Sequence, residues 1–365
     1  MSRHCIFLVP GDPDARTGGF LYDRHIARGL SASGWQVEVR SLGEGWPRPT
    51  AAVRTTAHRS VEALPDGAWV VADALAYGAM PEIAQAHAQR LRWVALVHHP
   101  LALETGLDAP ARAELFESER RALAAARGVI VTSASTARAL AAYGVPRARI
   151  AVVEPGTGPA PLASGSGGGP LSLLCVATLT PRKGHALLLD ALAGLRDRRW
   201  VLHCAGSPTM DPGCAEAIAQ RIDGHRLRDR VVLHGECDAR QLEALYARAD
   251  LFVLPSFHEG YGMALAEALA HGLPVISTTA GAIPDTVPAD AGLLVAPGDE
   301  TALRAALARV LDVPAERARL ATGARAARLR LPSWEQSVAR FASALEALCG
   351  ARGQGSTAAA PERTP

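Results

Sequence analysis

Short apolar runs recur twelve times along the chain, and they constrain its fold more than any other feature. Runs such as CIFLVP at 5–10 and DLFVLPS at 250–256 are continuous and rich in Val, Leu and Ile. Continuous runs of this length predict parallel strands that are covered on both faces. Helical patterns such as those at 18–34 and 263–272 separate the runs, so we predict an α/β fold with doubly wound sheets. The predicted strands lie at 5–10, 36–42, 68–75, 92–99, 128–135, 149–156, 171–179, 200–206, 230–236, 250–256, 273–278 and 291–297.

A stretch rich in Gly, Pro and Ser divides this alternation into two parts. The segment GTGPAPLASGSGGGP, 156–170, has the composition of a flexible linker. We therefore predict two Rossmann-like domains, 1–155 and 171–331, which face each other across a cleft. A final helix at 332–350 is expected to cross back to the first domain. The polar tail, 351–365, is expected to be disordered.

Composition restricts the class of protein. A chain of 365 residues suits two domains, and a net charge of +2 argues against a nucleic-acid partner. No apolar segment approaches the ~18 residues that a membrane span needs, and we find no leader, so a cytoplasmic protein is expected. We expect the six cysteines to be reduced and to bind no metal: Cys5, Cys175, Cys204, Cys214, Cys237 and Cys349.

The segment after the first strand, GDPDARTGG at 11–19, lacks the G-x-G-x-x-G pattern of a dinucleotide site. This argues against an NAD-dependent oxidoreductase, although that class also uses Rossmann domains. Gly18 and Gly19 open the next helix and would let a ligand approach backbone N–H groups at its positive end. The alternative is a plain loop before a helix.

Lysine occurs once among the 38 Lys and Arg residues, at Lys183 beside Arg182. Both residues stand at a predicted helix entrance, where the helix dipole disfavours positive charge. Two cations in that position indicate an anionic ligand, and a diphosphate suits an ammonium beside a guanidinium. A solvated basic turn is the alternative interpretation.

Two adjacent histidines, His98 and His99, follow the fourth predicted strand. The carboxyl ends of parallel strands are where open α/β sheets bind ligands. A histidine there can donate a hydrogen bond to a sugar hydroxyl or to a phosphate, or it can be structural. Neighbouring residues of a strand point in opposite directions, so we expect at most one of the two to face the cleft.

The stretch SFHEGYGMALAEALAHGLPVIST, 256–278, carries the strongest signal. Glu259 lies in a glycine-containing loop, and Glu267 lies eight residues later on the following helix. Glycines between them expose N–H groups at a helix start, where a diphosphate fits. The carboxylates can accept hydrogen bonds from the hydroxyls of a sugar and of a ribose. The alternative is that both acids merely favour the helix dipole.

The nine residues EGYGMALAE, 259–267, match the E-x7-E motif of retaining glycosyltransferases of the family 4 type, and the chain resembles that family over most of its length. The resemblance implies the GT-B fold. It also implies transfer of a sugar from a nucleotide-diphosphate sugar with retention of configuration, without a metal or other cofactor. Matching segments follow the family's order: Gly18–Gly19, the His98 region, 129–145, 149–157, Arg182–Lys183, 249–276 and 291–299.

The resemblance also implies roles for individual residues. The first domain would bind the acceptor and the second the donor. Arg182 and Lys183 would neutralise the leaving diphosphate, Glu259 would contact the sugar and Glu267 the ribose. His98 would lie beside the transferred sugar, with His99 as the second choice. The remaining residues expected to bind ligand are Gly18 and Gly19, which would close over the phosphates or the acceptor, and Gly260, Tyr261, Gly262 and Met263, which would bind the donor.

Two departures from the family pattern leave the sugar open. Asp285 stands where such proteins usually have Glu, and Ala282 stands where a second Gly is common. We expect the acceptor to be a small molecule, a saccharide or a lipid-linked molecule. A sugar-nucleotide epimerase or a sugar phosphorylase shares the fold and is the alternative function. The Arg-rich segment 317–331 suggests peripheral membrane contact, but we prefer a solvated helix.

Overall fold

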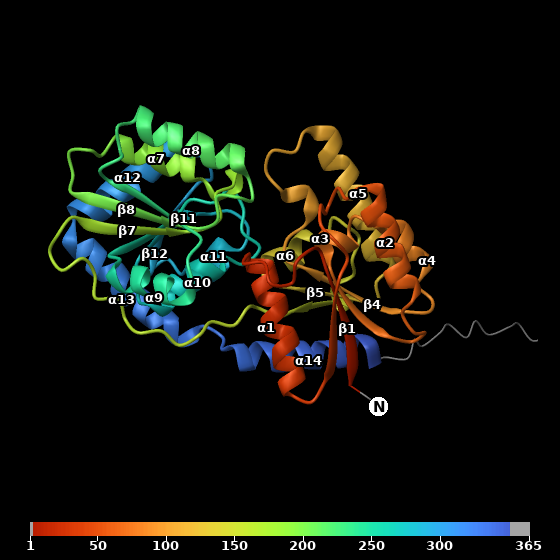
Figure 1. The fold of residues 1–365 in the computed structure, drawn as a ribbon. Helices are drawn as coiled ribbons and strands as arrows, with labels where there is room; N and C mark the ends of the chain where they lie inside the picture. Colours follow the sequence, from red (N-terminus) through yellow and green to blue (C-terminus); the bar gives the residue numbers. More distant parts are fainter. Residues whose placement is uncertain (1–2, 351–365) are drawn as a thin grey trace, which may run out of the picture.

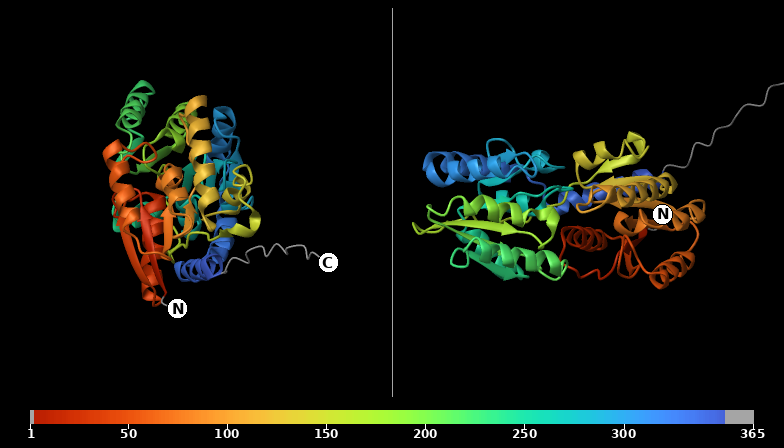
Figure 2. Two further views of the ribbon diagram at one scale, coloured as in Figure 1. Left: turned by 90° about the vertical axis from the view of Figure 1, so that its right-hand side faces the viewer. Right: turned by 90° about the horizontal axis from the view of Figure 1, so that it is seen from above.

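The structure is a computed structural model that describes residues 3–350, with side chains as far as residue 348. It consists of two α/β halves that lie side by side (Figures 1 and 2). Each half contains a six-stranded sheet in which every neighbouring pair of strands is parallel. Each of the twelve predicted strands is present, so the predicted α/β fold class is confirmed. The expected tail at 351–365 lies outside the described residues.

The sheet of the first half has the strand order β2-β1-β3-β4-β5-β6. Its order reverses after β1, which makes the junction of β1 and β3 a topological switch point. Its strands are β1 His4–Val9, β2 Gln36–Ser41, β3 Trp69–Asp73, β4 Arg92–Val97, β5 Gly128–Val131 and β6 Ile150–Val152. Its helices are α1 Gly18–Ala32, α2 Ala51–Glu62, α3 Ala74–Tyr77, α4 Pro81–Ala86, α5 Ala109–Ala125 and α6 Ala134–Ala139, with the 3-10 turns η1 Leu101–Leu103 and η2 Arg147–Arg149.

The second sheet has the order β12-β11-β10-β7-β8-β9, with its switch point between β7 and β10. Its strands are β7 Leu171–Val176, β8 Trp200–Ala205, β9 Val231–Gly235, β10 Leu251–Leu254, β11 Val275–Thr278 and β12 Gly292–Val295. The helices are α7 His185–Ala193, α8 Pro212–Gly224, α9 Ala239–Arg248, α10 Met263–Ala270, α11 Ile283–Thr286, α12 Glu300–Asp312, α13 Pro314–Ala327 and α14 Trp334–Gly350, with η3 Pro181–Lys183 and η4 Arg328–Arg330.

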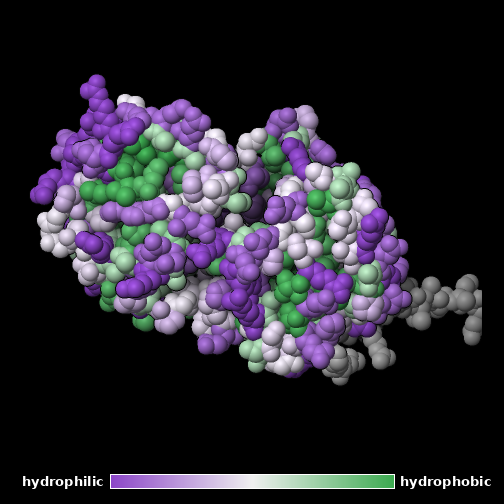
Figure 3. All heavy atoms as spheres, viewed as in Figure 1, coloured by the Kyte–Doolittle hydropathy of each residue, from purple (hydrophilic) through white to green (hydrophobic). Residues whose placement is uncertain are grey.

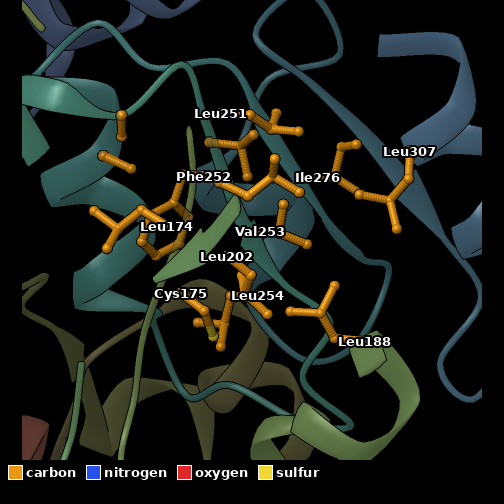
Figure 4. Close-up of a cluster of buried hydrophobic side chains, with 14 of the residues drawn as sticks. Leu174, Cys175, Leu188, Leu202, Leu251, Phe252, Val253, Leu254, Ile276 and Leu307 are labelled. Carbon is orange, nitrogen blue, oxygen red and sulfur yellow. The ribbon is translucent and has the colours of Figure 1, made fainter. Parts of the chain in front are cut away.

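Strand β1 shows why its sequence is continuously apolar. Ile6 and Leu8 belong to the core on one face of the sheet, whereas Cys5 and Phe7 belong to the core on the other. Successive side chains of a strand point to opposite faces, so a strand covered on both sides buries all of them. The second half is built in the same way, around a large core that includes Leu174, Leu202 and Phe252 (Figure 4).

Helix α14 follows the second half in sequence but packs on the first half. Val338, Phe341 and Leu345 lie in the same core as Phe7, and the rings of Phe7 and Phe341 stack with centroids 5.9 Å apart. The helix lies beside α1 and the adjoining strands (Figures 1 and 2). The chain thus passes between the halves twice.

The two passages lie against each other. Thr157 N donates to Pro332 O at 2.8 Å, and Ser337 Oγ donates to Glu154 O at 2.7 Å. A Cβ atom on Gly156 would meet the backbone of Trp334 at 2.4 Å, so only glycine permits this approach.

The remaining expectations concern the cysteines and membrane-spanning helices. Cys5, Cys175 and Cys204 are buried, and Cys214 and Cys237 are half-buried. The side chain of Cys349 lies outside the described part of the chain. No helix of residues 3–350 is long and apolar enough to cross a membrane.

Candidate active site

The site lies where the carboxyl ends of the two sheets meet. Loops that follow β7 and β10 carry Lys183 and Glu259, and these strands flank the switch point of the second sheet. Asp73 ends β3 and His98 follows β4 in the first half. A recess between the two halves is visible in the space-filling view (Figure 3). This is the position at which open parallel sheets bind ligands.

Glu259 forms the centre of a buried charge cluster. Its Oε1 accepts hydrogen bonds from Lys183 Nζ at 2.7 Å and from Ser256 Oγ at 2.6 Å. Arg182 Nη1 lies 3.7 Å from Oε2. Burial alone would raise the pKa of Glu259, but the charges of Lys183 and Arg182 outweigh that effect and lower it. Glu259 is therefore ionised at neutral pH.

Arg182 and Lys183 end the turn η3, and a glycine brings this turn to Glu259. Gly184 has a φ of +72°, and a Cβ atom there would meet Pro255 O at 2.2 Å. Two hydrogen bonds join the loops: Phe257 N donates to Arg182 O at 2.8 Å, and Arg182 Nη1 donates to His258 O at 2.9 Å. Burial lowers the pKa of Lys183, and Glu259 opposes part of that effect.

Glu104 of the first half reaches across to the same arginine. Arg182 Nε donates to Glu104 Oε1 at 3.1 Å, and His99 Nε2 lies 3.3 Å from Glu104 Oε2. Burial would raise the pKa of Glu104, but the hydrogen bond to His99 and the charge of Arg182 lower it to about 2. Glu104 and Glu259 are therefore each paired with a cation, and an incoming anion would compete with both carboxylates for Arg182.

Glu267 has different surroundings from Glu259. It lies on α10, where Tyr246 Oη donates to its Oε2 at 2.9 Å. Burial raises the pKa of Glu267, and the hydrogen bond from Tyr246 opposes this. The two glutamates of the E-x7-E spacing thus lie in contrasting environments, one beside cations and one beside a neutral phenol.

Three helices begin at the site without a side-chain cap: α1, α7 and α10. Among the other helices, aspartates cap α5, α8, α9 and α12, whereas α4 and α13 also begin without a side-chain cap. The starts of α1 and α10 adjoin, since a Cβ atom on Gly18 would lie 3.8 Å from Met263 Sδ. Uncapped helix starts leave N–H groups and a partial positive charge available to an anion.

The loop before α10 is closely fitted to both halves. A Cβ atom on Gly260 would meet His98 O at 2.0 Å, and Gly262 caps α10 with a φ of +90°. Tyr261 O accepts a hydrogen bond from Thr286 Oγ1 at 2.7 Å. The predicted glycines therefore lie where a side chain would separate the halves or distort the helix start.

The two adjacent histidines have different neighbours. The ring of His98 lies on α1, where a Cβ atom on Gly19 would be 3.2 Å from His98 Cδ2, and His98 Nε2 lies 3.1 Å from Asp23 Oδ1. The ring of His99 lies near Glu104 and His258, with ring centroids of the two histidines 5.9 Å apart. Gly19 thus supports the ring of His98, which the sequence alone did not indicate.

Within residues 3–350, one group of three His, Cys, Asp or Glu side chains has its ligand atoms within 4.8 Å of one another: Asp23, Asp73 and His98. Burial and the neighbouring charge of Asp23 raise the pKa of Asp73 to about 7. A proton held near neutral pH is one way to offset two buried carboxylates. We therefore interpret the group as a hydrogen-bonded cluster and assign no metal to it.

Sequence reasoning missed five residues of this site: Asp23, Asp73, Glu104, Tyr246 and Ser256. Asp23 interrupts the apolar face of the helix at 18–34, which was the one available signal for it. Ser256 lies inside the 256–278 stretch, but nothing in the sequence indicated that its hydroxyl contacts Glu259.

Two facing Rossmann-like halves with this site between them define the GT-B fold. The chain is similar to sucrose-phosphate synthase from Thermosynechococcus elongatus, with a TM-score of 0.80 at 23% identity over 93% of this chain and 98% of that one. It is also similar to Anabaena HepE in complex with UDP and glucose, with a TM-score of 0.74 at 19% identity over 95% of this chain and 100% of that one.

Residues 18–160 match the model of Glycosyltransferase Family 4, and residues 170–313 match that of Glycosyl transferases group 1. A D-inositol 3-phosphate glycosyltransferase of Thermomonospora curvata is 30% identical over 295 residues, which cover 72% of this chain and 67% of that protein. The chain therefore belongs to the glycosyltransferases of the family 4 type.

A second relative, the MMP alpha-(1->4)-mannosyltransferase of Mycolicibacterium hassiacum, is 32% identical over 168 residues. That match covers 46% of this chain but only 40% of the relative.

Proposed function

We propose that this protein transfers a sugar from a nucleotide-diphosphate sugar to an acceptor hydroxyl, with retention of anomeric configuration and without a metal ion. The observation that carries the proposal is the pair Arg182–Lys183, which lies beside Glu259 and the uncapped starts of α7 and α10. Similar solved structures hold UDP and UDP-glucose, and relatives are named for sugar transfer.

The cations would act on the leaving group. The bond between the anomeric carbon and the diphosphate breaks, and negative charge develops on the phosphate oxygen. Arg182, Lys183 and the amides at the start of α10 would stabilise that charge, which is the task a divalent cation performs in other sites. Arg182 and Lys183 are only 18% and 15% exposed, so water screens them weakly.

Retention follows if the acceptor attacks the face that the diphosphate leaves. The acceptor oxygen then bonds to the anomeric carbon, and its proton passes to the departing phosphate oxygen. In this proposal the protein mainly positions the reactants and excludes water. Glu259 would contact the sugar and Glu267 the ribose, in keeping with their separate surroundings.

A panel of UDP-, GDP-, ADP- and TDP-sugars tests the donor class by thermal stabilisation of the full chain. A ligand at 100 times its Kd stabilises the folded state by about 2.7 kcal/mol, which is readily measured. Lys183→Ala is the matched control, since it should reduce stabilisation by the nucleotide sugar. If no nucleotide sugar stabilises the protein, the proposed donor class is wrong.

A second experiment separates the reaction classes. Turnover of the stabilising donor is followed with an added glycoside acceptor, with inorganic phosphate and with neither. Transfer to the acceptor, with product of unchanged anomeric configuration by proton NMR coupling, is the expected result. Sugar phosphate formed only with inorganic phosphate would indicate a phosphorylase, and an isomerised sugar would indicate an epimerase.

A further inference from the structure

The buried carboxylates around His98 have no role in the function proposed above. Asp23 comes from the second turn of α1, and Asp73 comes from the end of β3, so two separate elements supply them. They are 4% and 6% exposed. Removing a carboxylate from water is costly, and two such groups in one place require compensation.

Both carboxylates approach the same ring nitrogen. His98 Nε2 lies 3.1 Å from Asp23 Oδ1 and 3.7 Å from Asp73 Oδ2. Asp73 is itself fixed, because its Oδ1 accepts from Leu75 N at 2.7 Å at the start of α3. Asp23 Oδ2 is buried without a hydrogen-bond partner. The proton on Nε2 is therefore committed to the carboxylates, and Nδ1 is the nitrogen left for a ligand.

We propose that Asp23 and Asp73 are positioning residues that hold His98 as an imidazolium, whose Nδ1–H donates a hydrogen bond to the sugar of the bound donor. This inference rests on the proposed function for the identity of its ligand. It assigns His98 the role of a hydrogen-bond donor and excludes that of a general base, because an imidazolium has no free lone pair.

The electrostatics agree with the geometry. Burial alone would lower the pKa of His98, but the charge and hydrogen bond of Asp23, with the charge of Asp73, raise it to about 9. Tyr22 also faces the ring, edge-on at 5.4 Å between centroids, and its hydroxyl donates to Val153 O; the neighbouring His99 interacts with His98 by charge. A raised pKa keeps the imidazolium fully formed at neutral pH and lost only as the pH rises through about 9.

Histidine-labelled full-length protein tests the protonation state by NMR without any substrate. The signal of His98 is identified by its loss in His98→Asn. In the wild type it should titrate near 9, and in Asp23→Asn its midpoint should move by about one pH unit or more toward the ordinary value of 6.5. The control is Asp14→Asn, which removes an exposed carboxylate from the loop before α1 and should leave the midpoint unchanged.

A wild-type midpoint at or below 6.5 would overturn the proposal. An unchanged midpoint in a folded Asp23→Asn would overturn the role of Asp23. If Asp23→Asn does not fold, Asp73→Asn takes its place, and the wild-type titration still decides whether His98 is an imidazolium.

The role toward the sugar is tested with UDP and UDP-glucose as probes. The ratio of their affinities isolates contacts to the sugar, since Lys183 acts on both. In the wild type the affinity for UDP-glucose relative to that for UDP should fall about tenfold as the pH rises through the His98 midpoint. In Asp23→Asn the same fall should occur at lower pH. A ratio that does not depend on pH would overturn the contact. If neither probe binds, that result counts against UDP-glucose as the donor, while the NMR titration judges the imidazolium independently.

Discussion

The Nζ atom of Lys183 lies 2.7 Å from Oε1 of Glu259, and both side chains are largely removed from solvent. The only lysine of the chain, which follows β7, thus forms an ion pair with a buried carboxylate that follows β10. Because Glu259 also binds Ser256, the lysine can turn toward an incoming anion without leaving the glutamate unpaired.

Lys183→Ala should lower kcat/KM by roughly 10- to 150-fold, since a charge-assisted contact of about 1.5–3 kcal/mol is lost. Binding of a nucleoside diphosphate should weaken more than binding of the nucleoside. Calorimetric titration with both ligands checks this. Unchanged affinity for the diphosphate would remove the phosphate role.

The double variant Lys183→Ala/Glu259→Gln should lose less folding stability than the two single variants combined, because neither charge is then left buried alone.

Glu259→Gln and Glu267→Gln should differ in their kinetic effects. Glu259 is expected to act in the transition state, so its loss should lower kcat by about 10²-fold or more. Glu267 is expected to hold the ribose equally in both states, so its loss should raise the donor KM by roughly tenfold. Steady-state kinetics on both folded variants decide. Full kcat in Glu259→Gln with a large loss in Glu267→Gln would reverse the two roles.

Activity should survive chelation, because Arg182, Lys183 and the helix amides are proposed to stabilise the diphosphate. We expect the initial rate to be the same within error before and after dialysis against EDTA. Abolished activity that Mn²⁺ or Mg²⁺ restores would show that the proposal of metal independence is wrong.

The ion pair between the halves should make stability depend on acid pH. The folded-state pKa of Glu104 is about 2, below its ordinary value of 4.5. A lowered pKa contributes stability that is complete above 4.5 and is lost as the pH falls through about 2. Glu104→Gln should therefore reduce the dependence of the melting temperature on pH in that window. If the melting temperatures of the two proteins depend on pH in the same way, the pairing of Glu104 with Arg182 is contradicted.

Truncation of a single side chain on α14 should destabilise the first half. Phe341 is fully buried against Phe7, so Phe341→Ala should cost about 3–5 kcal/mol of unfolding free energy. Leu329→Ala is the control, because Leu329 is 84% exposed and its truncation should change stability by no more than about 0.5 kcal/mol. Denaturant titration compares the two, and equal midpoints would mean that α14 does not support the core.

The strands could be predicted because burial on both faces leaves a continuous apolar run in the sequence. Gly262 could be predicted as well, since it precedes the start of α10, but Gly184 was not singled out from the sequence. Glu104 could not, because its partner Arg182 is 78 residues away and only the approach of the two halves joins them. Asp73 was equally hidden, since an aspartate after a strand is also a common helix cap, and Asp73 is one.

The preference between the two histidines could not be resolved from the alternation of a strand. His98 and His99 already lie beyond the end of β4, so their directions depend on what packs around them. His98 lies on α1 because Gly19 has no side chain, and His99 lies by Glu104. The family resemblance places a histidine at this position, but the carboxylates behind His98 are visible only in the structure.

Helix α14 has a consequence for the order in which the molecule is made. A ribosome releases the N-terminal half first, and domains generally fold in that order. Here one face of the first sheet is completed by Val338, Phe341 and Leu345, which emerge only after the whole second half. During synthesis the first half must therefore wait with part of its core open to water, and the last residues translated in the described chain close it.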